Sequence, residues 1–243
     1  MPFDFFLSLS LQNVQPLFAA AMDALGIRNS DHIVVYGTDG CMATSRAYIT
    51  FKSMGHEPTK VHLLQGSLKE WQDKGGPLDT DPTTTILAES LDLSQEPLYQ
   101  ASDAVGFCNM DQVLDLASNN GDWGIILDAR SVGRFQATEP EPRPGLRGGH
   151  IPGSINIPFQ TLLEGPTDWT KFKSDEKLKE VFQGAGVEIF DNTKLLVCTC
   201  GSGVTAAVIA VALEKCGRDR SKTLIYDGSW AEWGADASTP IAT

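Results

Sequence analysis

The sequence lacks an excess of positive charge: 19 Lys and Arg stand against 31 Asp and Glu, giving a formal net charge of -12. Nucleic acid and anionic membranes both require clustered positive charge, so we expect neither as the main partner. No apolar run approaches the roughly 20 residues of a membrane span. The first eleven residues are apolar but contain no Lys or Arg, which makes them a poor secretory or mitochondrial targeting signal. A small anionic substrate remains compatible with the charge, because a few arginines can set the local field.

Cysteine is also scarce, with five residues in 243. An odd number in a chain of this length does not indicate a disulfide framework, and reduced thiols in the cytoplasm are the simpler expectation. A mitochondrial location is the alternative if a targeting segment precedes this sequence. Cys198 and Cys200 form a Cys-x-Cys pair, but no histidine or second cysteine pair lies at the usual ligand spacing. We therefore expect neither a metal nor a cofactor.

Short β-branched segments alternate with helical ones along the chain. This alternation predicts an α/β fold with mainly parallel sheets flanked by helices. The predicted strands are residues 33–36, 61–64, 125–128, 155–157 and 195–197, and the predicted helices are 43–54, 67–74, 110–117, 175–182 and 206–215.

The layout of residues 33–71 returns 162 positions later. Residues 195–197 match 33–35, and five identities stay in register: Gly55 with Gly217, Gly66 with Gly228, Ser67 with Ser229, Glu70 with Glu232, and Trp71 with Trp233. Two copies of one α/β unit are therefore predicted. We expect a shortened first domain at 1–82, a linker at 83–106 that is rich in polar residues and Pro, and a complete second domain at 107–243.

Cys200 is the strongest candidate nucleophile. It follows a buried strand and precedes a helix, where the helix dipole and free backbone N–H groups favour the thiolate form. Gly201 and Gly203 allow successive N–H groups to point inward as an anion-binding nest, and Ser202 and Thr205 add hydroxyl groups. A structural thiol would not need flanking glycines.

Cys200 can be compared with the matching position of the first copy and with the neighbouring Cys198. Thr38 occupies the position that matches Cys200, so the first copy has no nucleophile there, and Cys41 lies three residues later. Cys198 is expected to be an inert core thiol. Cysteine phosphatases place an arginine six residues after the cysteine to hold phosphate. Ala206 stands at that position here, which argues against phosphatase chemistry.

The loop Cys200-Gly201-Ser202-Gly203-Val204-Thr205 resembles the active-site loop of the 3-mercaptopyruvate and thiosulfate sulfurtransferases, a family of tandem rhodanese domains. The resemblance extends to residues 128–130, 133–135, 139–143, 149–154 and 226–230. It also covers about residues 18–75, which resemble the family's inactive first domain and place Arg46 in its degenerate loop. Thiosulfate-preferring members carry basic residues where Gly201 and Ser202 stand.

This resemblance implies roles for several residues. Arg134 and Arg143 would hold the carboxylate of mercaptopyruvate, which suits the guanidinium fork. Cys200 would be the nucleophile, Ser202 a helper, and Gly201, Gly203, Val204 and Thr205 substrate-binding loop positions. Asp128 would support the loop indirectly. We expect His150 to stabilise a turn, and Trp230 and Trp233 to pack in the core.

The family's first domain contains an aspartate and a histidine proposed to assist the active-site serine. None of His32, His56 and His62 lies in a matching motif, so this relay cannot be assembled from the sequence. The family's first domain normally begins with a strand that carries Asp and is followed by a His-Ile-Pro-Gly turn, and this region has no match in the sequence. Without its strands, a sheet edge and a core face would be left uncovered.

The resemblance implies a sulfurtransferase that accepts sulfur from a small anionic donor. It would pass that sulfur from a Cys200 persulfide to a thiol, cyanide or thioredoxin. The alternative is a catalytically impaired sulfur carrier or partner-binding module.

Overall fold

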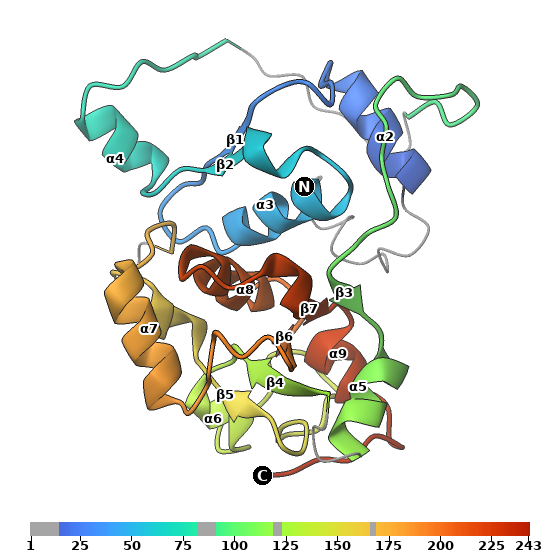
Figure 1. Ribbon diagram of the computed structural model, residues 1–243, viewed down its shortest axis with the longest axis vertical. Helices are drawn as coiled ribbons and strands as arrows, with labels where there is room; N and C mark the ends of the chain where they lie inside the picture. The colour runs from blue at the N-terminus through green and yellow to red at the C-terminus, as the bar shows by residue number, and fades with distance from the viewer. Residues whose placement is uncertain (1–14, 82–90, 119–122, 166–168) are drawn as a thin grey trace.

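The computed structural model describes residues 15–81, 91–118, 123–165 and 169–243 and contains two parallel sheets (Figure 1). We call the described residues before 107 the N-terminal half and those from 107 onward the C-terminal half. The N-terminal half has a two-stranded sheet, in which Ile33 pairs with Val61 and Val35 with Leu63. Its elements are α2 (Gln15–Ala24), β1 (Ile33–Val35), α3 (Thr44–Ser53), a 3-10 helix (Pro58–Lys60), β2 (Val61–Leu63) and α4 (Leu68–Asp73).

The C-terminal half is built on a five-stranded parallel sheet with the order β3-β7-β6-β4-β5. The strands are β3 (Phe107–Cys108), β4 (Gly124–Asp128), β5 (Ile155–Asn156), β6 (Leu195–Thr199) and β7 (Thr223–Tyr226). The helices are α5 (Met110–Ser118), α6 (Val132–Phe135), α7 (Asp175–Gly184), α8 (Ala206–Lys215) and α9 (Ser229–Trp233), with 3-10 helices at Phe159–Leu162 and Arg220–Lys222.

The predicted elements are present with boundaries within about two residues, and the α/β class is confirmed. Strands β1 and β2 occupy the same places in the repeat as β6 and β7. Ser67 caps α4 by accepting a hydrogen bond from the Glu70 N–H, as its spacing predicts. Helix α2 was not predicted from the sequence. The apolar first eleven residues lie outside the described part of the chain.

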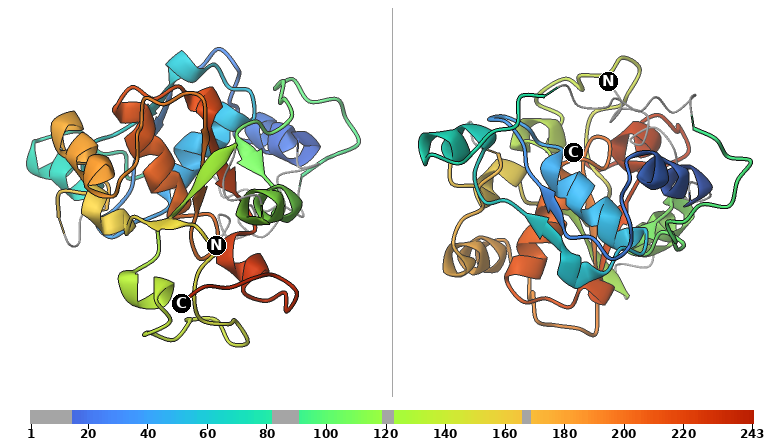
Figure 2. Two further views of the ribbon diagram at one scale, coloured as in Figure 1. Left: turned by 60° about the horizontal axis from the view of Figure 1, so that its bottom comes forward. Right: turned by 90° about the horizontal axis from the view of Figure 1, so that it is seen from above.

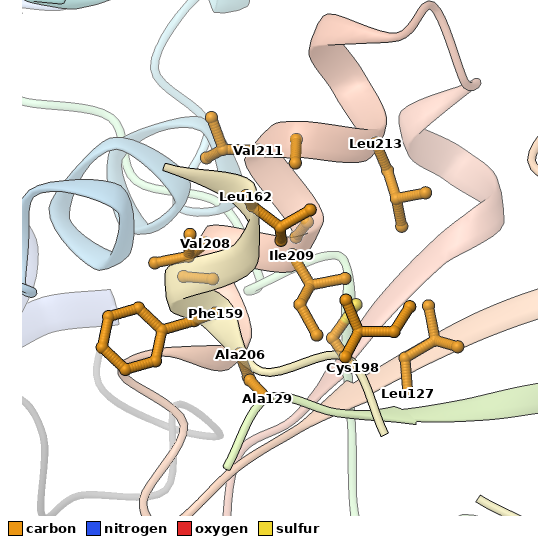
Figure 3. Packing of buried hydrophobic residues seen from close by; sticks show 14 of the residues in the cluster. Leu127, Ala129, Phe159, Leu162, Cys198, Ala206, Val208, Ile209, Val211 and Leu213 are labelled. Atoms are coloured by element: carbon orange, nitrogen blue, oxygen red, sulfur yellow. The ribbon is translucent and has the colours of Figure 1, made fainter. Parts of the chain in front are cut away.

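The main core lies between α8 and the five-stranded sheet. Every residue of α8 from Ala206 to Leu213 is buried, so this helix is apolar on all sides. In Figure 3, Ile209 of α8 points toward the sheet, where Cys198 of β6 and Leu127 of β4 lie, and these residues belong to one buried cluster with Leu162. This packing explains why the predicted helix is nearly continuous in small and branched apolar residues.

Helix α3 joins the two halves. It lies between the two-stranded sheet and α8, as the views in Figures 1 and 2 show. Ile49 of α3 is 1% exposed and belongs to the core of the C-terminal half. Tyr48 donates a hydrogen bond to Glu214 at 2.8 Å, and Arg220 donates one to Ser53 at 2.6 Å. The halves are therefore joined by apolar packing around Ile49 and by part-buried polar contacts.

The other face of the two-stranded sheet is open. Val34 and Tyr36 are 55% and 57% exposed, and among the described residues no strand pairs with the second edge of β1. The segment before β3 also packs inward, because Tyr99 is fully buried beside Phe18 and accepts or donates a hydrogen bond at His56.

Candidate active site

Cys200 begins the loop that connects β6 to α8. Its side chain is almost fully buried, and its Sγ accepts a hydrogen bond from the Ser202 N–H at 3.4 Å. A backbone N–H directed at sulfur stabilises the negative charge of a thiolate. The contact from Ser202 that the structure places on the sulfur is thus made by its backbone rather than by its hydroxyl group.

The backbone of this loop is held on its other side by the turn into α9. The Cys200 N–H donates to Ser229 Oγ at 3.3 Å, and the Trp230 and Ala231 N–H groups donate to the carbonyls of Cys200 and Gly201, both at 3.0 Å. Fixing these carbonyls outward leaves the Ser202 N–H free to face the sulfur. Ser229 adopts a positive φ of 50°, whereas its repeat counterpart Ser67 has φ -87°. The same serine is therefore a helix cap in one copy and a loop support in the other.

Glycine is needed at positions 201 and 203 for different physical reasons. Gly203 has φ +75°, a conformation that side chains other than glycine rarely adopt. Gly201 has no such φ, but a Cβ at its position would lie 3.0 Å from Arg134 Nη2 and 3.6 Å from Arg143 Nη1. Only Gly203 curls the loop by a left-handed backbone, while Gly201 leaves room for two guanidinium groups.

Arg134 and Arg143 converge on Gly201, as the resemblance implies for a carboxylate site. Arg143 is exposed and donates to the Gly201 carbonyl at 3.4 Å. Arg134 is 22% exposed and is already paired with Glu141 through Nε at 3.2 Å and Nη2 at 2.6 Å. Its Nη1 and the second N–H of Nη2 face the loop, at 3.5 and 3.0 Å from the place a Cβ would take at Gly201. The site therefore offers two cations beside Cys200.

A buried ion cluster orients Arg134. Asp128 and Glu141 both accept hydrogen bonds from Arg130, whose side chain is fully buried. Arg130 also stacks over Trp230, with its guanidinium carbon 4.1 Å from the ring centroid. Asp128 pairs with Thr199 across the β4–β6 register. Asp128 is therefore linked to Arg134 through Arg130 and Glu141, and to the strand before the Cys200 loop through the sheet.

The remaining candidates divide into loop and core positions. Val204 is buried, and Thr205 lies at the N-cap of α8 without capping it through its side chain. Cys198 is fully buried, and burial raises the pKa of its thiol, in agreement with an inert core cysteine. Burial and the nearby Asp227 carboxylate raise the pKa of Cys108 to about 12. Trp230 and Trp233 are buried as predicted.

His150 forms an isolated antiparallel bridge with Ala242, immediately before the turn at residues 152–153. Its ring stacks on Phe135 with centroids 3.7 Å apart, and Nδ1 is 2.8 Å from the Phe135 carbonyl oxygen. Within the described ranges, no group of three or more His, Cys, Asp or Glu side chains is arranged to hold a metal ion. No helix in the same ranges is both long and apolar enough to cross a membrane.

Sequence reasoning did not assign roles to Glu141, Arg130, Asp227 or Ser229, although each lies in a motif that carries the resemblance. It also did not place Arg46 beside the Cys200 loop of the second copy. The Arg46 guanidinium contacts the Gly203 carbonyl and Asp227. The two Arg46 contacts join residues 157 and 181 positions apart, so no local spacing rule could have found them.

A cysteine in a strand-to-helix loop, on a parallel sheet and paired with a degenerate copy, defines a rhodanese-type protein. The chain belongs to the rhodanese-like domain family, which it matches over residues 6–74 and 110–236.

Individual relatives are similar over most of this chain. The 3-mercaptopyruvate sulfurtransferase of Escherichia coli is 37% identical over 226 residues, covering 92% of this chain and 72% of the relative. The thiosulfate/3-mercaptopyruvate sulfurtransferase 1, mitochondrial, of Arabidopsis thaliana is 34% identical. That match covers 92% of this chain and 59% of the plant protein, so this chain spans less than two thirds of the length of that relative.

Solved structures agree. The crystal structure of SseA from Escherichia coli, described as having the rhodanese fold of 3-mercaptopyruvate sulfotransferases, matches with a TM-score of 0.69 and 31% identity, covering 88% of this chain and 72% of SseA. The Tum1 protein from Saccharomyces cerevisiae matches with a TM-score of 0.73 and 28% identity, covering 91% and 72%. The rhodanese fold predicted from the sequence is thereby confirmed.

Proposed function

We propose that the protein is a sulfurtransferase that carries sulfur from 3-mercaptopyruvate on Cys200 as a persulfide. One observation carries the proposal: a buried sulfur that accepts a backbone N–H lies in a loop against which two guanidinium groups converge. The names of the bacterial and plant relatives support the same reaction. The arrangement combines a stabilised nucleophile with a site for a carboxylate.

In the first half-reaction, Arg134 and Arg143 bind the donor carboxylate and orient its sulfur toward Cys200. The Cys200 thiolate attacks that sulfur and forms an S–S bond. The carbon–sulfur bond breaks, and its electron pair leaves on carbon as pyruvate enolate, which takes up a proton to become pyruvate. Loop N–H groups and Ser202 are the candidate donors to the developing charge, while Gly203, Val204 and Thr205 shape the loop.

In the second half-reaction, the thiolate of an acceptor attacks the outer sulfur of the persulfide. A new persulfide forms on the acceptor, and Cys200 leaves as the thiolate. A small thiol or thioredoxin can fill this role chemically. Cyanide attacks the same outer sulfur through its carbon and departs as thiocyanate, which again releases the Cys200 thiolate. The two steps predict ping-pong kinetics.

Mercaptopyruvate is favoured over thiosulfate because the loop itself carries no cation at Gly201 or Ser202. A basic side chain at Gly201 would also occupy the space next to Arg134 and Arg143. Thiosulfate remains a slower donor in this proposal, since both arginines can still attract its sulfonate group.

We also propose the division into residues 1–82, 83–106 and 107–243, with the catalytic residues in the last segment. The two separate sheets support this division. A cytoplasmic location is supported by free cysteines at all five positions. The relatives include a bacterial enzyme and one named as mitochondrial.

Intact mass after exposure to mercaptopyruvate tests the function. The wild type should gain one sulfur atom and release pyruvate, whereas Cys200→Ser should gain none. Cys41→Ser is the matched control in the counterpart loop and should gain sulfur normally. A folded wild type that gains no sulfur would sink the proposal and leave the sulfur-carrier or partner-binding alternative.

Arg134→Ala should raise KM for mercaptopyruvate, and an unchanged KM would refute the carboxylate role.

A further inference from the structure

Arg46 is a buried cation of the N-terminal half whose side-chain contacts lie in the C-terminal half. Arg46 is 3% exposed and comes from the first turn of α3. Its Nη2 donates to Asp227 Oδ1 at 2.6 Å, and its Nη1 donates to the Gly203 carbonyl at 3.4 Å. The guanidinium carbon also lies 4.9 Å from the centre of the Phe107 ring. These three contacts fix the position of the buried Arg46 guanidinium.

The partners of Arg46 are parts of the machinery around Cys200. Gly203 is the left-handed position of the sulfur loop, and Asp227 begins the turn that carries Ser229. Ser229 accepts the Cys200 N–H, and the two following residues bind the loop carbonyls. Arg46 therefore ties the two segments that shape the loop to each other.

The charge of Asp227 adds an electrostatic role. Asp227 Oδ1 lies 3.3 Å from the place that a Cβ would take at Gly203. A carboxylate is therefore packed against the loop that must hold an anionic sulfur. An uncompensated carboxylate at this place would disfavour the Cys200 thiolate. Arg46 offsets that charge at a distance where solvent screening is weak, because its side chain is only 3% exposed and that of Asp227 is 18% exposed.

We infer that Arg46 is a positioning residue through which the N-terminal half sustains the reactivity of Cys200. This inference rests on the proposed function. It assigns a task to a copy of the repeat that has no nucleophile of its own. Arg46 holds the Gly203 carbonyl away from the sulfur and neutralises Asp227, and it touches neither donor nor acceptor.

The test compares Arg46→Met and Arg46→Lys with Arg220→Met. Arg220 is a matched control because it is also an arginine of the same interface, where it donates to Ser53. The first readout is the rate at which excess iodoacetamide alkylates Cys200 at neutral pH, followed by peptide mass and requiring no sulfur donor. The second is the separation of kcat from KM with mercaptopyruvate. Thermal unfolding of each variant establishes that the compared proteins are folded.

Arg46→Met should slow alkylation about tenfold, because a charge-assisted hydrogen bond and the compensation of Asp227 are lost together. It should lower kcat in parallel while KM changes less than about twofold, since Arg134 and Arg143 still bind the carboxylate. Arg46→Lys should fall between Arg46→Met and the wild type, because its ammonium keeps the charge but cannot reach both partners. Arg220→Met should alkylate at the wild-type rate.

A second substitution separates positioning from simple support of the fold. Asp227→Asn added to Arg46→Met should restore part of the alkylation rate, because the uncompensated carboxylate is removed. A double variant slower than Arg46→Met would contradict this part of the inference. Equal alkylation rates in wild type, Arg46→Met and Arg46→Lys, or equal losses in Arg46→Met and Arg220→Met, would overturn it. A wild type that alkylates at Cys200 but takes no sulfur would refute the proposed function alone.

Discussion

Glu141→Gln tests whether the buried ion cluster orients Arg134 for the donor. The Glu141 side chain is 2% exposed and accepts hydrogen bonds from Arg130 at 2.9 Å and from Arg134 at 3.2 and 2.6 Å. Glutamine keeps the shape but removes the charge. In either orientation of its amide, the NH₂ group points at an arginine N–H where a carboxylate oxygen accepted a hydrogen bond. Removing one partner of a buried ion pair costs about 3–5 kcal/mol.

The lower end of that range applies here because Asp128 continues to compensate Arg130. A loss of about 3 kcal/mol in the free energy of unfolding corresponds to a fall of about 6–12 °C in Tm for a chain of this size. Arg134 also loses two of its anchors. The donor must then immobilise that side chain on binding, at a cost of about 0.5–1.5 kcal/mol, so KM should rise about two- to thirteenfold. The change in kcat should be smaller.

Differential scanning calorimetry and steady-state kinetics with mercaptopyruvate measure both effects. Glu139→Gln is the control: Glu139 is exposed, lies two residues away and accepts from Ser131 rather than from an arginine. Its Tm and KM should remain close to the wild type. An unchanged Tm in Glu141→Gln would show that the cluster contributes little to stability. A lowered KM would refute the orienting role, because it would mean that Glu141 competes with the donor for Arg134.

Two further predictions concern the loop support and the buried thiols. Ser229→Ala removes the acceptor of the Cys200 N–H and should cost about 1–3 kcal/mol in urea unfolding. Ser229→Gly should cost less because glycine accepts φ 50° without strain, and an equal loss in both variants would contradict this. Cys108 has a folded pKa of about 12 against an ordinary 9.0, so its neutral thiol stabilises the fold at neutral pH and this contribution is lost as pH rises above 9. Wild type should therefore lose on the order of 1 kcal/mol by about pH 10 that Cys108→Ala does not lose, and parallel curves of unfolding free energy against pH would refute this assignment.

The sequence predicts the elements and the nucleophile because these depend on local patterns. Alternating apolar segments reveal β4 and β6, and the glycine-rich segment after β6 reveals the loop. The 162-residue repeat shows that only the second copy has a cysteine at the position of Cys200, where the first copy has Thr38. Even there, the sequence treats Gly201 and Gly203 alike, whereas only Gly203 has the left-handed backbone. The need for glycine at 201 comes from two arginine side chains that arrive from other segments.

The supports of the site are harder to predict because they are tertiary. Ser67 and Ser229 occupy equivalent positions, and a local rule predicts a helix cap for both. The prediction holds for Ser67, but Ser229 turns instead to the Cys200 N–H. Glu141 is one of two glutamates in a Pro-rich segment, and nothing local distinguishes it from the exposed Glu139. Burial against Arg130 and Arg134 makes the distinction.

The short first copy has a physical reason to fold only together with the second. A two-stranded sheet of three-residue strands is at most marginally stable in isolation, and one face of this sheet is open to solvent at Val34 and Tyr36. Helix α3 buries Ile49 in the other half's core and brings Lys52 into an ion pair with Glu214. Separating the halves would expose that apolar surface and leave buried charges unpaired, so the halves should unfold in one transition. The same helix carries Arg46 to the sulfur loop, and stability of the first copy is therefore coupled to the geometry at Cys200.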